Sequence, residues 1–134
     1  MIRVLVIAND PIIREILAAR LNRDGFQVLT ATNGTQAIAL ARAELPDLIV
    51  LTMNLPIANE WQVVQRIKAT PQTSRIPIIA IVDDLTTSTH DRCLAAGCDD
   101  CETRPIDMIQ LGAKIRLLAG RSERGRMLQR IIAG

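Results

Sequence analysis

The sequence is almost without aromatic residues: Phe26 and Trp61 are the only two, and tyrosine is absent. Proteins that hold single-stranded nucleic acid usually stack its bases on aromatic side chains. The shortage therefore argues against direct nucleic-acid binding by this domain. Hydrophobic residues nevertheless make up 49% of the chain, and the mean hydropathy is +0.20. That composition excludes a disordered chain and predicts an aliphatic core.

Long apolar runs are also absent. No stretch approaches the roughly 20 apolar residues that a membrane-spanning helix needs, and residues 1–7 lack the cleavage site of a signal peptide. The three cysteines, an odd number, fit a reducing compartment better than a framework of disulfides. We therefore expect a cytoplasmic protein without a membrane span.

The length of 134 residues suits one domain. Charge is distributed unevenly along it. Residues 114–134 hold six Lys or Arg against one Glu, a net of +5, so residues 1–113 carry −3 of the total of +2. We divide the chain into a domain at 1–119 and a basic tail or linker at 120–134. This tail is interpreted as a partner-binding helix, a linker to an output domain or a frayed end. Gly120, Gly125 and Gly134 argue against a rigid helix there.

Apolar runs alternate with amphipathic stretches five times. The runs at 2–8, 26–31, 48–52, 78–82 and 98–103 predict strands. The stretches from Pro11 to about 23, from 34 to 45, near 58–68, at 86–96 and from about 106 predict helices. Such alternation predicts an α/β fold, in which a doubly wound, five-stranded parallel sheet carries helices on both faces.

Several segments resemble the receiver domains of response regulators. The segment at 47–56, DLIVLTMNLP, resembles their third strand, and further matches follow the family's order at 4–11, 25–28, 31–34, 76–79, 96–100 and 104–106. The resemblance covers about residues 2–118. It implies a flavodoxin-like, CheY-like fold with strand order 2-1-3-4-5 and a functional site at the carboxyl ends of the strands.

The same resemblance implies a phosphorylation site whose chemical groups are missing. The family uses two acidic residues after the first strand and an Asp after the third to bind Mg²⁺ and accept a phosphoryl group. It adds a hydroxyl after the fourth strand and a Lys after the fifth. These positions fall here on Ala8, Asn9, Thr52, Val82 and Arg104.

We therefore predict a degenerate pocket, that of a pseudo-receiver without the phosphoacceptor Asp. Hard cations such as Mg²⁺ prefer carboxylate oxygens, so we expect no metal and no other cofactor. A threonine hydroxyl without a base is a poor nucleophile, so Thr52 is interpreted as a polar cap rather than a phosphosite, and we expect no enzyme activity. Arg104 is expected to bond Asn9, Thr52 or a backbone carbonyl. A loop glycine of the family falls on Glu60.

Two clusters leave alternatives open. Asp83-Asp84 reads as the start of a helix rather than a relocated metal site. His90, Cys93, Cys98 and Cys101 have spacings that partly match an iron–sulfur motif, but a structural role fits their predicted elements better. Cys101 falls on the family's switch position, so redox sensing by its thiol remains an alternative.

The preferred hypothesis is a signalling module that acts through phosphorylation-independent protein–protein interaction. The expected partner is a histidine kinase or an output or effector protein, with a homodimer as another arrangement. The fourth helix, fifth strand and fifth helix would form the docking face, with test residues Asp91, Arg92, Asp99, Glu102, Met108 and Lys114. The alternatives are a conventional phosphorylated receiver with unusual ligands, and a small-anion sensor that uses Arg104 in the vacated pocket.

Overall fold

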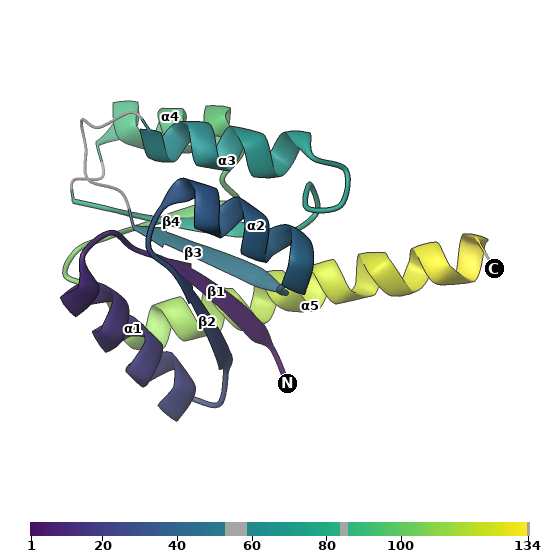
Figure 1. Cartoon of the computed structure of the whole chain (residues 1–134), viewed down its shortest axis with the longest axis horizontal. Helices are drawn as coiled ribbons and strands as arrows, with labels where there is room; N and C mark the ends of the chain where they lie inside the picture. The colour runs from purple at the N-terminus through teal and green to yellow at the C-terminus, as the bar shows by residue number, and fades with distance from the viewer. Residues whose placement is uncertain (53–58, 84–85, 134) are drawn as a thin grey trace.

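The computed structural model describes residues 1–52, 59–83 and 86–133 (Figure 1). The strands are β1 (Arg3–Ile7), β2 (Gln27–Ala31), β3 (Leu48–Thr52), β4 (Ile78–Val82) and β5 (Asp100–Thr103). The helices are α1 (Pro11–Arg23), α2 (Gly34–Glu44), α3 (Asn59–Ala69), α4 (Thr87–Ala96) and α5 (Met108–Ala133). All strand pairs are parallel, in the order β2-β1-β3-β4-β5. The predicted architecture is confirmed.

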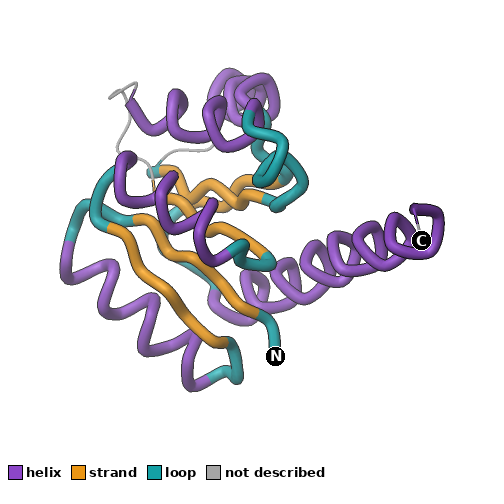
Figure 2. Tube along the Cα trace, turned by 45° about the vertical axis from the view of Figure 1, so that its right-hand side comes forward, coloured by secondary structure: helices purple, strands orange, loops and turns teal. Residues whose placement is uncertain are grey.

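Helices cover both faces of the sheet, which explains why its central strands are apolar throughout. In β3, Ile49 and Leu51 belong to the cluster that includes residues of α2, α3 and α4. Leu48 and Val50 belong to the cluster that includes α1 and α5. Successive side chains of a strand point to opposite faces, so a strand that is covered twice has no polar side. Figure 2 shows the two helical layers on either side of the strands.

Polar side chains and one glycine fix the helix ends. Asp10 Oδ1 accepts from the Ile12 amide at 2.8 Å, directly before Pro11 in the first helical position. Thr86 Oγ1 accepts from the Thr89 amide at 3.1 Å at the start of α4. Gly97 ends α4 with φ of 112°, in the left-handed region that favours glycine. The expected helix start at Pro11 and the stop at Gly97 are confirmed, and α4 begins one residue after the expected Thr86, which caps it.

Two predicted boundaries shift by about two residues. The fifth strand begins at Asp100, because Cys98 still belongs to the turn that ends α4, where its amide donates to Cys93 O at 3.0 Å. The last helix begins at Met108, because Asp107 Oδ1 accepts from the Gln110 amide at 3.1 Å and so caps the helix. The predicted start of the third helix at Ala58 lies outside the described residues.

The α5 helix runs for 26 residues and projects well beyond the sheet (Figures 1 and 2). Its backbone is helical through Gly120 and Gly125, so the expectation that the glycines would disfavour a helix is wrong. A glycine costs a helix only about 1 kcal/mol relative to alanine, and the neighbouring Arg, Leu and Met residues are good helix formers. The division at residue 119 falls inside α5 and stays a prediction.

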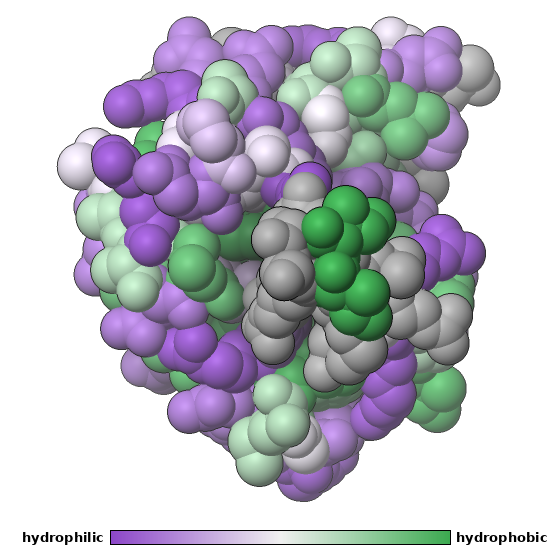
Figure 3. Space-filling view, turned by 90° about the vertical axis from the view of Figure 1, so that its right-hand side faces the viewer, coloured by the Kyte–Doolittle hydropathy of each residue, from purple (hydrophilic) through white to green (hydrophobic). Residues whose placement is uncertain are grey.

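The end of α5 carries exposed hydrophobic side chains. Ile131 and Ile132 are 70% and 83% exposed, and hydrophobic side chains lie at the centre of the view from this end (Figure 3).

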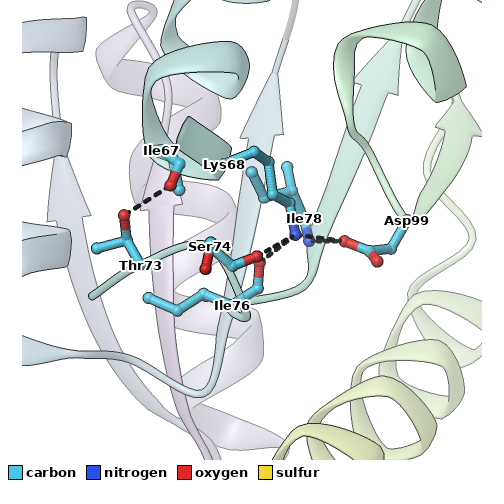
Figure 4. A network of polar contacts seen from close by, with 7 residues as sticks. All are labelled: Ile67, Lys68, Thr73, Ser74, Ile76, Ile78 and Asp99. Carbon is cyan, nitrogen blue, oxygen red and sulfur yellow. Dashed lines mark hydrogen bonds and ion pairs between the residues drawn. The ribbon is translucent and has the colours of Figure 1, made fainter. Parts of the chain in front are cut away.

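A polar network joins α3 to the amino end of the sheet (Figure 4). Lys68 Nζ donates to the Ile76 carbonyl at 2.7 Å and to Asp99 Oδ2 at 3.0 Å. The same Asp99 oxygen accepts from the Ile78 amide at 2.8 Å. Asp99 therefore ties the start of β4 to the turn before β5.

In the described part of the chain, no helix combines the length and apolarity that crossing a membrane requires.

Candidate functional site

The five residues of the predicted pocket follow four strands at one edge of the sheet. Ala8 and Asn9 come directly after β1, Thr52 ends β3, Val82 ends β4 and Arg104 follows β5. The carboxyl ends of parallel strands meet at the same edge, which is where an open α/β sheet binds its ligands. The fold therefore brings these positions to one end of the domain, but their side chains have different surroundings.

Thr52 stands at the phosphoacceptor position implied by the resemblance. Its side chain is nearly buried, at 9% exposure, and Oγ1 donates to the Ile7 carbonyl at 3.4 Å. The hydroxyl proton is therefore directed to the backbone of the neighbouring strand. This geometry is that of a polar group that caps the end of β1.

The two positions after β1 carry no anionic group. Ala8 is buried, and its carbonyl accepts from Arg14 Nη1 at 2.9 Å. Asn9 is exposed and has no side-chain partner in the described part of the chain. The acidic residue that follows, Asp10, caps α1 by accepting a hydrogen bond from the Ile12 amide.

Arg104 pairs with Asp83, the residue directly after β4. Its Nη1 lies 2.5 Å from Asp83 Oδ1, and the Arg104 side chain is 26% exposed. We expected Asn9, Thr52 or a backbone carbonyl as the partner, and this expectation is wrong. A carboxylate attracts a guanidinium more strongly than a neutral amide or hydroxyl does. Asp84, the other half of the predicted acidic pair, lies outside the described residues.

A cavity of about 190 Å³ opens at the carboxyl ends of β1 and β3, beside α2 and α3. Asn9 and Thr52 line it, whereas Val82 is fully buried in the core and Arg104 is held by Asp83. The residues of the predicted pocket are thus divided between the cavity, the core and an ion pair. Arg104 is not among the described residues that line the cavity, so the geometry does not support the expectation of an anion held there by Arg104.

Glu60 is a lining residue of the cavity that the sequence analysis noted only as a departure from the family. It lies in the first turn of α3, and its Oε2 is buried without a hydrogen-bond partner. The signal in the sequence was a carboxylate at a position where the family has glycine. Gly34, at the start of α2, lines the cavity too.

A magnesium site of the family's kind does not fit these side chains. Among the described residues of the cavity lining, Glu60 supplies the only carboxylate, beside the neutral groups of Asn9 and Thr52. The family resemblance implies a metal site with three carboxylates. Hard divalent cations prefer such anionic oxygen ligands, so the single carboxylate of Glu60 is too few. Within residues 1–52, 59–83 and 86–133, no three His, Cys, Asp or Glu side chains are grouped to hold a metal ion.

Cys93, Cys98 and Cys101 are free, buried and in contact with one another between α4 and the sheet. Burial, and then the neighbouring Cys93 and Asp99, raise the pKa of Cys98 to about 12. Burial likewise raises the pKa of Cys93 and of Cys101. The thiolate is the reactive form, so these thiols are poorly reactive at neutral pH. With His90 exposed on α4, the arrangement favours the structural role over a cluster or a redox sensor.

The six residues of the predicted docking face do not share one surface. Asp91 and Arg92 are exposed on α4, and the Arg92 guanidinium lies over the Trp61 ring at 5.3 Å. Asp99 is committed to Lys68 at the amino end of the sheet. Met108 lines a hollow with α1 residues on the other side of the domain.

Lys114 joins α5 to the edge strand of the sheet. Its Nζ lies 2.8 Å from Glu102 Oε1 and 3.1 Å from Asp100 Oδ2. Partial burial lowers the pKa of Lys114, but hydrogen bonds to the two carboxylates outweigh this and leave it raised. Glu102 is only 7% exposed, so it supports Lys114 rather than presenting its own charge.

Comparison with known proteins places these observations in a family. Residues 4–116 match the response regulator receiver domain. The chain is 32% identical over 122 residues to the DNA-binding dual master transcriptional regulator RpaA of Synechocystis, and 37% identical over 120 residues to the transcriptional regulatory protein AfsQ1 of Streptomyces coelicolor. These matches cover 91% and 90% of this chain but 51% and 52% of the relatives. The chain thus spans about half the length of the curated relatives it matches.

Solved structures show the same architecture. The chemotaxis protein CheY4 of Vibrio cholerae superposes with a TM-score of 0.80 at 22% identity, over 88% of this chain and 98% of that one. At this identity the likeness establishes the fold alone.

Proposed function

Because the chain belongs to the response regulator receiver domain family, we propose that it is a pseudo-receiver that signals by binding a protein partner without being phosphorylated. The observation that carries the proposal is Thr52, which stands at the phosphoacceptor position and donates its hydroxyl proton to the Ile7 carbonyl. Response regulator receiver domains act in two-component signalling. The proposal places this chain in the same kind of pathway and in the cytoplasm.

The loss of phosphorylation rests on charge. Phosphoryl transfer is catalysed by positioning the groups and by neutralising the charge on the transferred group. Thr52 is a neutral nucleophile, Asn9 is a neutral neighbour, and the positive charge of Arg104 is already balanced by Asp83. We therefore propose that the domain binds Mg²⁺ weakly, needs no cofactor and is not an enzyme.

The partner that we propose is a histidine kinase or an output or effector protein, with a second copy of the chain as the other arrangement. The face for it is formed by α4, β5 and α5, reduced from the predicted set to Asp91, Arg92 and Lys114. Two of these side chains are exposed on one helix, and the third is held in place by Glu102 and Asp100. The domain itself is proposed not to contact nucleic acid.

Incubation with acetyl phosphate and Mg²⁺, followed by mass spectrometry of the intact chain, tests the first half of the proposal. We expect no added phosphoryl group on the parent chain and none on Thr52→Ala. A modification on Thr52 that survives isolation and disappears in Thr52→Ala would mean that the domain is a phosphorylated receiver with unusual ligands.

The second half is tested by affinity capture with candidate kinases and effectors from the source organism. Asp91→Arg and Lys114→Glu should weaken capture, whereas Arg42→Glu, an exposed charge reversal on α2, should leave it unchanged. Equal capture by all three variants would contradict the proposed face.

A further inference from the structure

Among the described residues that line the cavity at the carboxyl ends of β1 and β3, only Glu60 carries a formal charge, and that charge is negative. Glu60 lines the cavity, and its Oε2 is buried without a hydrogen-bond partner in the described part of the chain. A carboxylate oxygen in this state has lost water without gaining a donor, which is costly. Among the described residues, no donor therefore satisfies this oxygen.

The neutral side chains near Glu60 include oxygens that can still accept hydrogen bonds. Thr52 Oγ1 gives its proton to the Ile7 carbonyl, and Thr32 Oγ1 gives its proton to Gln36 Oε1 at 3.0 Å. Both oxygens keep lone pairs that can accept. The side-chain amide of Asn9 has no partner among the described residues, and it offers an acceptor oxygen as well as donor N–H groups. A ligand with several donors would complement the Glu60 carboxylate and these acceptor oxygens.

Size and the remaining walls restrict the ligand further. The cavity of about 190 Å³ corresponds to several water molecules, each of which occupies about 30 Å³ in the liquid. Ile7, Leu51 and Val63 supply apolar walls. A single carboxylate balances a monocation, whereas a divalent metal ion asks for more anionic oxygen.

We propose that this cavity binds a small organic monocation, a primary ammonium or guanidinium group on a short apolar stem. The charged group would donate to Glu60, Thr52 and Asn9, and the stem would lie against the apolar walls. Arg104 does not compete for the site, because it is paired with Asp83 and is not among the described lining residues. The inference does not rest on the proposed docking function, since it concerns a different set of residues.

The test is a titration of the ¹⁵N-labelled chain, followed by amide chemical shifts. The probes are ethylammonium chloride and methylguanidinium chloride, compared with sodium chloride, magnesium chloride and inorganic phosphate at constant ionic strength. We expect saturable shifts at the amides of Asn9, Gly34 and Thr52 with the two organic cations only.

Glu60→Gln should weaken this binding by roughly tenfold, the loss of one charge-assisted hydrogen bond. Glu15→Gln removes the same charge from an exposed position of α1 and should leave the dissociation constant unchanged. Asn9→Ala, at an exposed position that tolerates truncation, should weaken binding several-fold and serves if Glu60→Gln fails to fold.

Three results would overturn the inference. These are saturable shifts of the same amides with phosphate or magnesium, equal binding by the parent chain and Glu60→Gln, and no saturation by either organic cation below about 0.1 M. Capture of a protein partner by Glu60→Gln is a separate readout, so a failure here and a failure of the docking proposal can be told apart.

Discussion

Arg104 Nη1 lies 2.5 Å from Asp83 Oδ1, so the cation that follows β5 is paired with the anion that follows β4. Both residues stand at the carboxyl edge of the sheet, where the family resemblance implies a phosphoryl-binding lysine. The pairing balances the positive charge locally. It leaves the neighbouring cavity, with Thr52 and Glu60 in its lining, without a cation from the described residues.

The Arg104–Asp83 pair should contribute little to stability. Asp83 is 51% exposed, and exposed ion pairs are worth about 0.2–1 kcal/mol. A double-mutant cycle of Arg104→Gln and Asp83→Asn, measured by urea unfolding, should give a coupling free energy in this range that falls as salt is added. A coupling several times larger and insensitive to salt would mean that the pair is shielded from solvent.

Thr52→Asp alone should not restore phosphorylation. The substitution supplies a nucleophile, but Ala8 and Asn9 still provide no carboxylate after β1, so the metal remains poorly held. Acetyl phosphate with Mg²⁺ and intact-mass detection should therefore show no phosphoryl group on Thr52→Asp. Efficient modification of this single variant would show that Mg²⁺ is held by other groups and that the alignment of the first strand is wrong.

Gly34→Ala should destabilise the fold through the wall of the cavity. A Cβ at position 34 would lie 2.6 Å from Val63 Cγ2, closer than side chains tolerate. Forcing α2 and α3 apart should cost about 1–3 kcal/mol in the free energy of unfolding. Gly120→Ala is the matched control, because its Cβ meets nothing within 4 Å, and it should stabilise α5 slightly. Val63→Ala in the Gly34→Ala background should recover part of the loss.

The buried thiols should make the fold less stable at alkaline pH. The pKa of Cys98 is about 12 in the folded chain against an ordinary value of 9.0, so the folded state holds this proton more tightly. Its contribution is fully present below pH 9 and is lost as the pH rises towards 12, because the unfolded chain releases the proton first. Urea unfolding from pH 7 to 10.5 should show this decline. Cys98→Ala should flatten it, and an unchanged slope would contradict the assignment.

Substitutions of Asp99 and Asp91 should have different effects: the first should lower stability, and the second should weaken partner binding. Asp99→Ala removes bonds to Lys68 Nζ and to the Ile78 amide, so it should lower the free energy of unfolding by about 1–2 kcal/mol and leave partner capture unchanged. Asp91→Ala, at an exposed position of α4, should stay within about 0.5 kcal/mol of the parent and weaken capture. The reverse pattern would restore Asp99 to the docking face.

Local patterns in the sequence were sufficient to predict the regular elements. The strands at 48–52 and 78–82 have the predicted bounds, because a strand covered on both faces is apolar throughout and is bounded by prolines or polar residues. The helix start at Pro11 and the cap of α4 at Thr86 follow from capping chemistry between residues two or three positions apart. The prediction for α5 failed, because the low helix propensity of its glycines was outweighed by the good helix formers beside them.

The side-chain partners at the site were not predictable in the same way. Arg104 meets Asp83 across 21 positions, Lys68 meets Asp99 across 31, and Glu60 reaches the cavity only because α3 starts beside α2. The sequence by itself determined the alternation of strands and helices and the missing carboxylates at Ala8, Asn9 and Thr52, since these depend on residue type and short spacing. Only the tertiary structure decided which charge faces the cavity, because electrostatic pairing depends on distance in space between residues that the fold brings together.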